Sequence, residues 1–230
     1  MGILKSAPQA TYTLRVIAHL LRYPDAALRD QLPALGLALH GERALTTGRL
    51  AEMDVLIEGL RAMPGLRAEA DYVELFDRGR HTALHLFEHV HGDSRDRGPA
   101  MVDLAQTYAA AGLLLGDGEL PDYLPVALEY ASTQPPEAAR AFLKETAHIL
   151  RAIFSALLAR RSPYASALAA LLDLAGEKAE AVKLPAEPAL DDNWAEPAAF
   201  AGCSTAGQAR PGQPQPVHLV KNRTQPGAST

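Results

Sequence analysis

The sequence contains a single cysteine, Cys203, and few aromatic residues. One cysteine cannot form an internal disulfide, so a disulfide-stapled scaffold is excluded and we expect a reducing compartment, the cytoplasm. Aromatic residues make up 6% of the chain, although 48% of the chain is hydrophobic. The apolar content therefore comes mainly from Ala and Leu, which are good helix formers.

The chain also lacks a long apolar run and a positive net charge. No stretch approaches the ~18 uninterrupted apolar residues that a membrane-spanning helix needs. Arg15, His19 and Arg22 interrupt the N-terminal apolar stretch where a signal peptide would lie. With 27 acidic and 22 basic residues the net charge is −5, which argues against a broad nucleic-acid-binding face. We therefore expect neither stable membrane insertion nor a nucleic-acid partner.

Apolar residues recur three and four positions apart up to Gly176, and no alternating strand pattern is found. This spacing predicts an all-α protein in which residues 1–184 form a single multi-helix bundle domain. Thr46 or Thr47 is expected to cap one helix, and Gly176 to end the last. The predicted helices span residues 12–22, 47–63, 67–77, 136–161 and 163–175, with a segment up to His40 that is broken near Pro33.

Residues 185–230 differ from the rest in composition. They hold 7 of the 17 prolines, few aliphatic residues and no helical period. Such a stretch cannot bury enough apolar surface to offset the entropy lost on ordering. We predict a largely disordered tail, in which the short segments 193–194 and 217–220 could dock onto the body of the protein or onto a partner.

Four histidines lie between residues 81 and 91, and His85-Leu-Phe-Glu88-His89 matches the H-x-x-E-H pattern of inverted zinc proteases. On a helix, His81, His85 and His89 would share one face. His85 and His89 could then bind zinc, with Glu88 as general base. A zinc enzyme would need a third protein ligand. The candidates are Asp122, Glu129 and Glu145, and the sequence does not favour one of them. Because the motif is short, a half-buried or solvated helix face is the simpler interpretation, and a zinc-dependent hydrolase is the alternative function.

The residues that follow predict a tight corner between two helices. Gly92 is placed to end one helix, and Asp96 to cap the next, with Pro99 in its first turn and Gly112 at its end. This corner could be a packed turn held by Asp–Arg pairs, or a polar rim for a bound segment, and the sequence does not separate the two. The polar residues gathered there are His91, Asp93, Ser94, Arg95 and Arg97.

Three blocks make the sequence similar to the NarJ-type nitrate reductase assembly chaperones, relatives of the TorD and DmsD redox-enzyme maturation proteins. They are YVELFD at 72–77, HGDSRDRGPAMVDLAQTYAAAG at 91–112 and ELPDYLPVALEYA at 119–131. DNWAEPAAFAG and QPVHLV in the tail also resemble the NarJ branch. The resemblance is close from about residue 70 onward and loose before it. Pro99 departs from the pattern, because an ordinary helix former is expected there.

This resemblance implies a cytoplasmic, all-helical, TorD-like chaperone that is not an enzyme and holds no cofactor or metal of its own. It implies a protein that binds unfolded polypeptide, here the N-terminal segment of the apo nitrate reductase α subunit. This binding would let molybdenum cofactor insertion precede membrane docking. The αβ complex and molybdenum cofactor biosynthesis proteins are further expected partners. In the family, the positions of His81, His85 and His89 commonly hold other residues, so the H-x-x-E-H match is then incidental.

A chaperone of this kind holds its client in a groove with an apolar floor and a charged rim. The corner residues are one part of the candidate site, and protonation of His91 could change client affinity. Ordinary core packing is an equal alternative for Tyr72 and Phe76, and solvation is the alternative for the carboxylates. The predicted apolar anchors are Tyr72, Phe76, Met101 and Tyr108, and the predicted contacts to basic client residues are Glu74, Asp77, Asp122 and Glu129.

Overall fold

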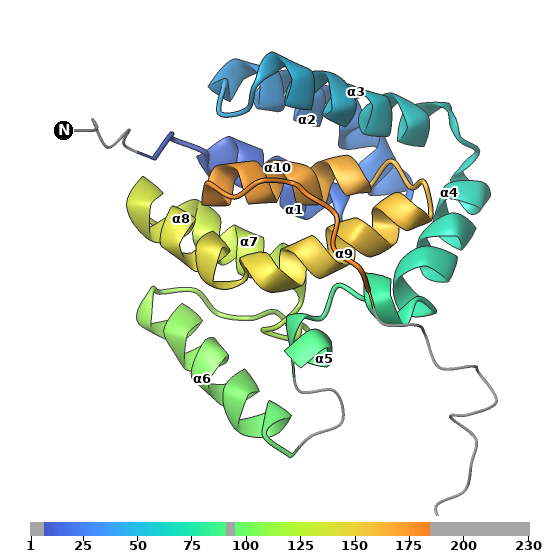
Figure 1. Cartoon of the computed structure of the whole chain (residues 1–230). Helices are drawn as coiled ribbons and strands as arrows, with labels where there is room; N and C mark the ends of the chain where they lie inside the picture. The colour runs from blue at the N-terminus through green and yellow to red at the C-terminus, as the bar shows by residue number, and fades with distance from the viewer. Residues whose placement is uncertain (1–6, 91–94, 185–230) are drawn as a thin grey trace, which may run out of the picture. The chain divides into compact units, whose positions relative to one another are not determined.

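The computed structural model describes residues 7–90 and 95–184, and within them the only regular structure is helical apart from one isolated β-bridge (Figure 1). The all-α prediction is confirmed. Among these residues, no helix combines the length and apolarity that crossing a bilayer requires. The helices are α1 (Thr11–Leu20), α2 (Ala26–Glu42), α3 (Thr47–Ala62), α4 (Gly65–Tyr72), α5 (Leu86–Val90), α6 (Arg97–Ala110), α7 (Leu124–Thr133), α8 (Pro136–Glu145), α9 (Ala147–Ala159) and α10 (Ala165–Ala175).

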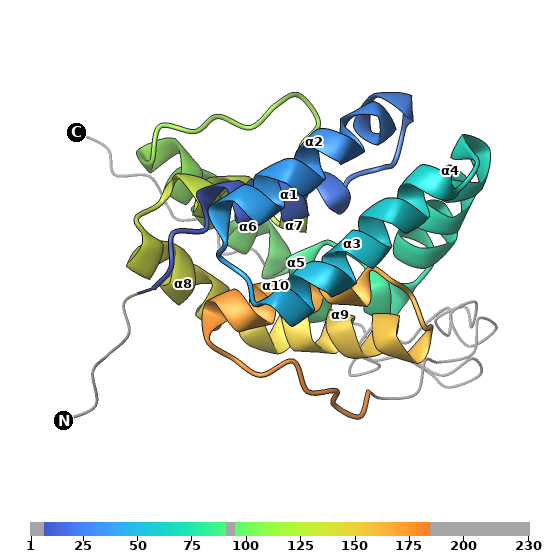
Figure 2. The same cartoon turned by 90° about the horizontal axis from the view of Figure 1, so that it is seen from above.

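Helices α1 and α10 lie in the middle of the described part. Helix α1 packs against α2 and α7, and α10 packs against α3, α8 and α9. The pair α2 and α3 covers one side of these two helices, and α7, α8 and α9 cover the other (Figures 1 and 2). All residues from Ala165 to Leu172 of α10 are buried, as expected of a helix that is apolar on every side. Its many alanines let neighbouring helices approach closely.

Helix α2 runs through Pro33 without a break, so the predicted interruption there is wrong. Proline removes one backbone hydrogen bond and crowds the preceding turn. Asp25 compensates at the start of the helix, where its side chain accepts a 2.8 Å hydrogen bond from the Leu28 N–H. Leu28, Leu32 and Leu39 are buried from the same helix. Burial of these side chains offsets the bond that Pro33 removes.

The predicted helix over residues 136–161 is two helices, α8 and α9, that meet at Thr146. The Thr146 hydroxyl donates to the carbonyls of Phe142 at 3.3 Å and Leu143 at 3.2 Å in the preceding turn. Such back-bonding bends helices. The bend lets α8 contact α7 while α9 follows α10. The apolar stripe predicted for one helix is therefore a core face shared by two.

Several local signals gave the expected helix ends. The Thr46 hydroxyl accepts a hydrogen bond from the Arg49 N–H at 3.3 Å, so Thr46 is the cap of α3. Gly176 ends α10 with a φ of 80°, the left-handed conformation that favours glycine. The predicted helix over 67–77 is α4 followed by a π-helical turn, Val73–Asp77. The predicted tail, 185–230, lies outside the described residues.

Candidate functional site

A buried carboxylate lies where the histidine segment meets the chain before α7. The side chain of Asp122 is fully buried (0% exposed). It accepts a 3.2 Å hydrogen bond from the Phe87 N–H and lies 3.2 Å from Nδ1 of His85 and 3.6 Å from a guanidinium nitrogen of Arg97. Arg97 also lies 3.7 Å from Glu88. We call His85, Glu88, Arg97 and Asp122 the junction. These donors compensate for the water that the carboxylate loses on burial.

Backbone pairing brings the junction together. The Leu86 N–H donates to the Asp122 carbonyl at 2.9 Å, and the Leu124 N–H donates to the Leu84 carbonyl at 2.8 Å. These bonds form the isolated antiparallel bridge between His85 and Tyr123. The Asp122 side chain then faces the His85 ring, although the two residues are 37 positions apart in the sequence.

The two histidines of the H-x-x-E-H motif have opposite electrostatic surroundings. The hydrogen bond to Asp122 raises the pKa of His85 above its ordinary value. Burial lowers the pKa of His89, whose Nε2 lies 2.8 Å from the Ala83 carbonyl. A lone carbonyl partner does not favour the charged ring enough to outweigh its desolvation. His85 and His89 thus engage different partners and do not converge on one point.

The zinc-hydrolase alternative is not supported. His81 lies in the 3₁₀ turn Arg80–Thr82. His85 precedes α5, whereas His89 lies within it. The prediction that the three histidines share one helix face is therefore wrong. The backbone bridge at His85 overrides the local helical spacing. No group of three or more His, Cys, Asp or Glu side chains that could hold a metal occurs within residues 7–90 and 95–184. Arg97 beside Asp122 also disfavours a bound cation there.

We expect His85 to make stability depend on pH. Asp122 raises the pKa of His85 in the folded protein above 6.5. Protonated His85 therefore contributes its full stabilisation of the fold below about pH 6.5. This contribution is lost as the pH rises through the pKa of His85 in the folded protein. The His85→Gln variant does not titrate at this position. Chemical denaturation should show the stability advantage of the wild type over this variant growing from about pH 8 to about pH 6. A constant advantage would contradict the pairing with Asp122.

The predicted apolar anchors are mostly buried. Tyr72 and Phe76 lie in the core, with ring centroids 4.8 Å apart. The Tyr72 hydroxyl donates to the Leu21 carbonyl at 2.9 Å, which supplies a partner for the C-terminal end of α1. Tyr108 is buried and donates to the Pro121 carbonyl at 2.9 Å, while Met101 is half-buried. These positions match the core-packing alternative for Tyr72 and Phe76, and a role of the four residues in client binding stays a prediction.

Two of the predicted carboxylates are exposed and lie on the π-helical turn. Glu74 pairs with Arg78 at 2.9 Å on the surface, and Asp77 is exposed next to it. Asp122 is no surface carboxylate, because it is fully buried in the junction. π-Helical turns are uncommon and occur frequently at functional sites. Glu74 and Asp77 are thus exposed, and their contact with basic client residues stays a prediction.

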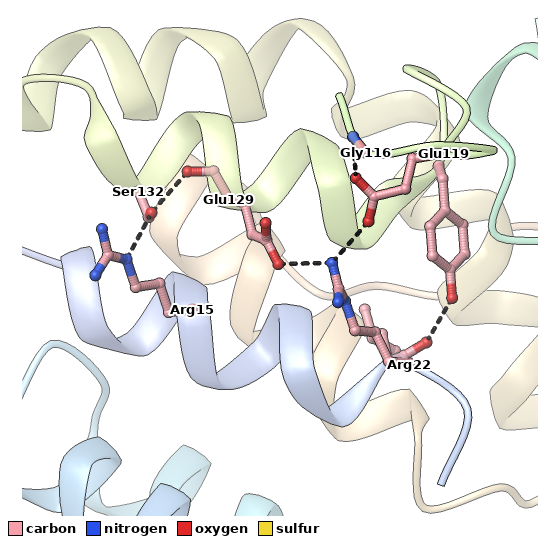
Figure 3. A network of polar contacts seen from close by, with 8 residues as sticks. Arg15, Arg22, Gly116, Glu119, Glu129 and Ser132 are labelled. Carbon is pink, nitrogen blue, oxygen red and sulfur yellow. Dashed lines mark hydrogen bonds and ion pairs between the residues drawn. The ribbon is translucent and has the colours of Figure 1, made fainter. Parts of the chain in front are cut away.

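Glu129 is held in a polar network between α1 and α7 (Figure 3). A guanidinium nitrogen of Arg22 lies 2.8 Å from Glu129 and 3.3 Å from Glu119. Glu119 accepts a hydrogen bond from the Gly116 N–H at 3.0 Å, and the Ser132 hydroxyl donates to the Glu129 carbonyl at 2.7 Å. Glu129 thus has an intramolecular partner, which a client residue would have to displace.

The corner residues divide into two groups. His91, Asp93 and Ser94 lie outside the described residues, so the predicted pH response of His91 stays a prediction. Arg95 is exposed, and Arg97 is half-buried in the junction. Helix α6 begins at Arg97 with Pro99 in its first turn, and Asp96 is its N-cap residue as predicted, although the Asp96 side chain makes no capping hydrogen bond to the helix.

Comparisons with known proteins decide the family. The sequence model of the family described as nitrate reductase delta subunit matches residues 24–170. The chain belongs to this family. Among curated relatives, the nitrate reductase molybdenum cofactor assembly chaperone NarJ of Escherichia coli (strain K12) is 42% identical over 182 residues, which cover 78% of this chain and 77% of that one.

Other relatives agree with this assignment. The probable nitrate reductase molybdenum cofactor assembly chaperone NarW of Escherichia coli (strain K12) is 43% identical over 71% of this chain and 68% of its own length. A putative redox enzyme maturation protein from Archaeoglobus fulgidus superposes with a TM-score of 0.52 and 18% identity, covering 77% of this chain and all of that one. At that identity the structural match shows the shared fold alone. The predicted NarJ-type assignment is confirmed.

The sequence blocks that identify this family member meet in space. Pro121, Asp122 and Tyr123 belong to the third block. The hydroxyls of Tyr123 and of Tyr72, from the first block, lie 3.1 Å apart. From the second block, Tyr108 donates to Pro121, and Arg97 pairs with Asp122. Sequence reasoning placed these residues in three separate blocks and missed their convergence.

Proposed function

We propose that this protein is a system-specific chaperone for respiratory nitrate reductase. In this proposal it binds the N-terminal segment of the apo α subunit and keeps that subunit competent for molybdenum cofactor insertion before membrane docking. The observation that carries the proposal is the 42% identity, over 78% of the chain, to a relative named as a nitrate reductase molybdenum cofactor assembly chaperone. The αβ complex and cofactor biosynthesis proteins are further proposed partners.

The protein acts by recognition in the cytoplasm and not by catalysis. Of the residues that suggested a hydrolase, His85 is engaged with Asp122, and His89 with the Ala83 carbonyl. A catalytic zinc site needs three protein ligands that lie close together, and no group of three His, Cys, Asp or Glu side chains that could hold a metal occurs within residues 7–90 and 95–184. The lack of such a group and the intramolecular contacts of His85 and His89 together support a structural use of the two histidines.

The acidic residues of α4 and of the turn over residues 73–77 support a basic client segment. Between residues 65 and 78, α4 and this turn carry four acidic residues, Glu69, Asp71, Glu74 and Asp77, against two arginines. Charges at a binding rim mainly steer encounter and set specificity. A client segment with basic residues would be attracted to this face.

Isothermal titration calorimetry with a synthetic peptide of the α subunit's N-terminal segment tests the proposal. We expect saturable one-to-one binding with a Kd of about 10 μM or tighter, since specific recognition of a segment in a groove reaches this range. Reversing the charge of Glu74 and Asp77 to Lys should weaken binding and slow association. The control variant reverses the exposed residues Asp117 and Glu145 instead. No heat of binding at high micromolar peptide would contradict the chaperone assignment.

A further inference from the structure

Residues 95–120, which comprise α6 and most of the connection to α7, bury very little. In this stretch Tyr108 is buried, and every other residue is exposed or half-buried. In α10, by contrast, all residues from Ala165 to Leu172 are buried. Among the described helices, none packs along α6, which lies at the edge of the bundle (Figure 1). Segments with few buried apolar contacts are the first to open in native proteins.

Tyr108 is the central attachment of this stretch. It is 1% exposed, and its hydroxyl donates to the Pro121 carbonyl at 2.9 Å. The centroid of its ring lies 4.8 Å from that of Tyr130 on α7. Tyr130 packs in turn against Phe142 of α8, edge-on, with centroids 5.4 Å apart. One row of aromatic rings thus runs from α6 through α7 to α8, and Tyr108 is the part that α6 contributes.

Charged contacts tie the two ends of the stretch to the bundle. At one end, Arg97 lies 3.6 Å from Asp122 and 3.7 Å from Glu88. At the other end, Glu119 lies 3.3 Å from Arg22. These distances exceed those of strong charge-assisted hydrogen bonds, and in each pair at least one side chain is more than a quarter exposed. Pairs of this kind contribute little to stability, and Asp122 keeps its other polar partners when Arg97 moves away.

A detached α6 would not remain helical by itself. Isolated helices of up to about 12–15 residues are marginal in water, and α6 has 14 residues. Gly98, Val102 and Thr107 lower its intrinsic helix propensity further. Detachment of α6 should therefore expose its backbone amides to exchange with solvent.

We propose that residues 95–120 form a flap that opens from the bundle as one unit while the other described helices stay folded. When the flap is closed, Tyr108 is buried against Tyr130. When it is open, the ring of Tyr130 is uncovered on the bundle and Tyr108 is exposed on the flap. Tyr108, one of the predicted client anchors, becomes accessible in this open state. The inference concerns the free protein and does not rest on the proposed chaperone function.

Hydrogen–deuterium exchange of the full chain, followed by mass spectrometry, tests the flap. The amides of α6 should exchange at least about 100-fold faster than those of α10, since a local opening needs less free energy than global unfolding. Urea below the unfolding midpoint should speed α10 exchange much more than α6 exchange, because a local opening exposes little surface. Equal protection with equal urea dependence would mean that α6 opens only with the whole protein, and would overturn the proposal.

Two mild substitutions of similar cost distinguish a flap from a part of the core. Tyr108→Phe removes the hydrogen bond to Pro121 in the closed state and should speed α6 exchange by about 3- to 10-fold. Ile57→Val shortens a buried side chain of α3 and should speed α10 exchange by about the same factor. It should leave α6 exchange unchanged, because α3 stays packed when the flap opens. If Ile57→Val speeds exchange in both helices equally, the flap is overturned.

Tyr108→Ala removes the ring together with its hydroxyl. It should leave α6 without protection while α10 stays protected, because the loss of stability cannot exceed the free energy of opening the flap. Tyr12→Phe, at an exposed tyrosine of α1, is the control and should exchange like the wild type in both helices. If α6 keeps its protection in Tyr108→Ala, Tyr108 does not hold the flap closed and the proposal is overturned.

Discussion

Asp122→Ala is expected to lower the free energy of unfolding by about 2–4 kcal/mol. Removing one member of a buried charged cluster leaves the others desolvated and unpaired, which typically costs about 3–5 kcal/mol. The side chains of His85 and Arg97 are 31% and 28% exposed, so water can partly replace the lost carboxylate and the expected loss is somewhat smaller than this typical cost. The Phe87 N–H also loses its acceptor. Urea denaturation measures the effect as a lower midpoint with an unchanged slope.

Two comparisons isolate the cause of this loss. Asp122→Asn keeps an acceptor for the Phe87 N–H but removes the charge, so it should fall between the wild type and Asp122→Ala. Asp117→Ala removes an exposed carboxylate and should change stability by less than about 0.5 kcal/mol. A loss below about 1 kcal/mol for Asp122→Ala would mean that the junction contributes no more than a surface pair.

Gly79→Ala is expected to cost about 2–3 kcal/mol. Gly79 connects the π-helical turn to the 3₁₀ turn. A β-carbon at this position would come closer to the Leu75 carbonyl and the Thr82 hydroxyl than real β-carbons do. The Leu75 carbonyl is backbone and cannot rotate away, so the chain must shift, and overpacking of this kind costs about 1–3 kcal/mol. The Thr82 hydroxyl, which donates to the Leu75 and Gly79 carbonyls, would also be displaced.

Gly59→Ala is the matched control for this prediction. Gly59 lies inside α3, and a β-carbon there meets nothing within 4 Å. It should stabilise the protein by about 0.5–1 kcal/mol, because alanine is the better helix former. Both substitutions restrict the unfolded chain in the same way. Their difference in denaturation midpoint therefore reports the clash at Gly79, and equal midpoints would refute it.

The local parts of the fold could be predicted from the sequence because their causes lie within a few residues. The Thr46 cap and the Gly176 stop depend on neighbouring backbone groups, and both were found where expected. The helical spacing of Ala and Leu predicted the all-α class. The family assignment came from three short sequence blocks, and relatives that are 42–43% identical to this chain agree with it.

The site was harder to predict because its contacts are distant in the sequence. The spacing of His81, His85 and His89 suggested one helix face, but the bridge to Tyr123 holds His85 outside any helix. Asp122 was expected at the surface, since carboxylates usually are exposed. It is buried because its partners come from other segments, and no local pattern records them.

The sequence by itself determined the helical class, several helix ends and the family of this protein, since periodicity, caps and residue order are local properties. Tertiary structure alone decided that α2 continues through Pro33, that α8 and α9 divide at Thr146, and that Asp122 meets His85 and Arg97. In each of these cases the local preference is worth only a few kcal/mol at most. Packing against segments far along the chain offsets a preference of that size.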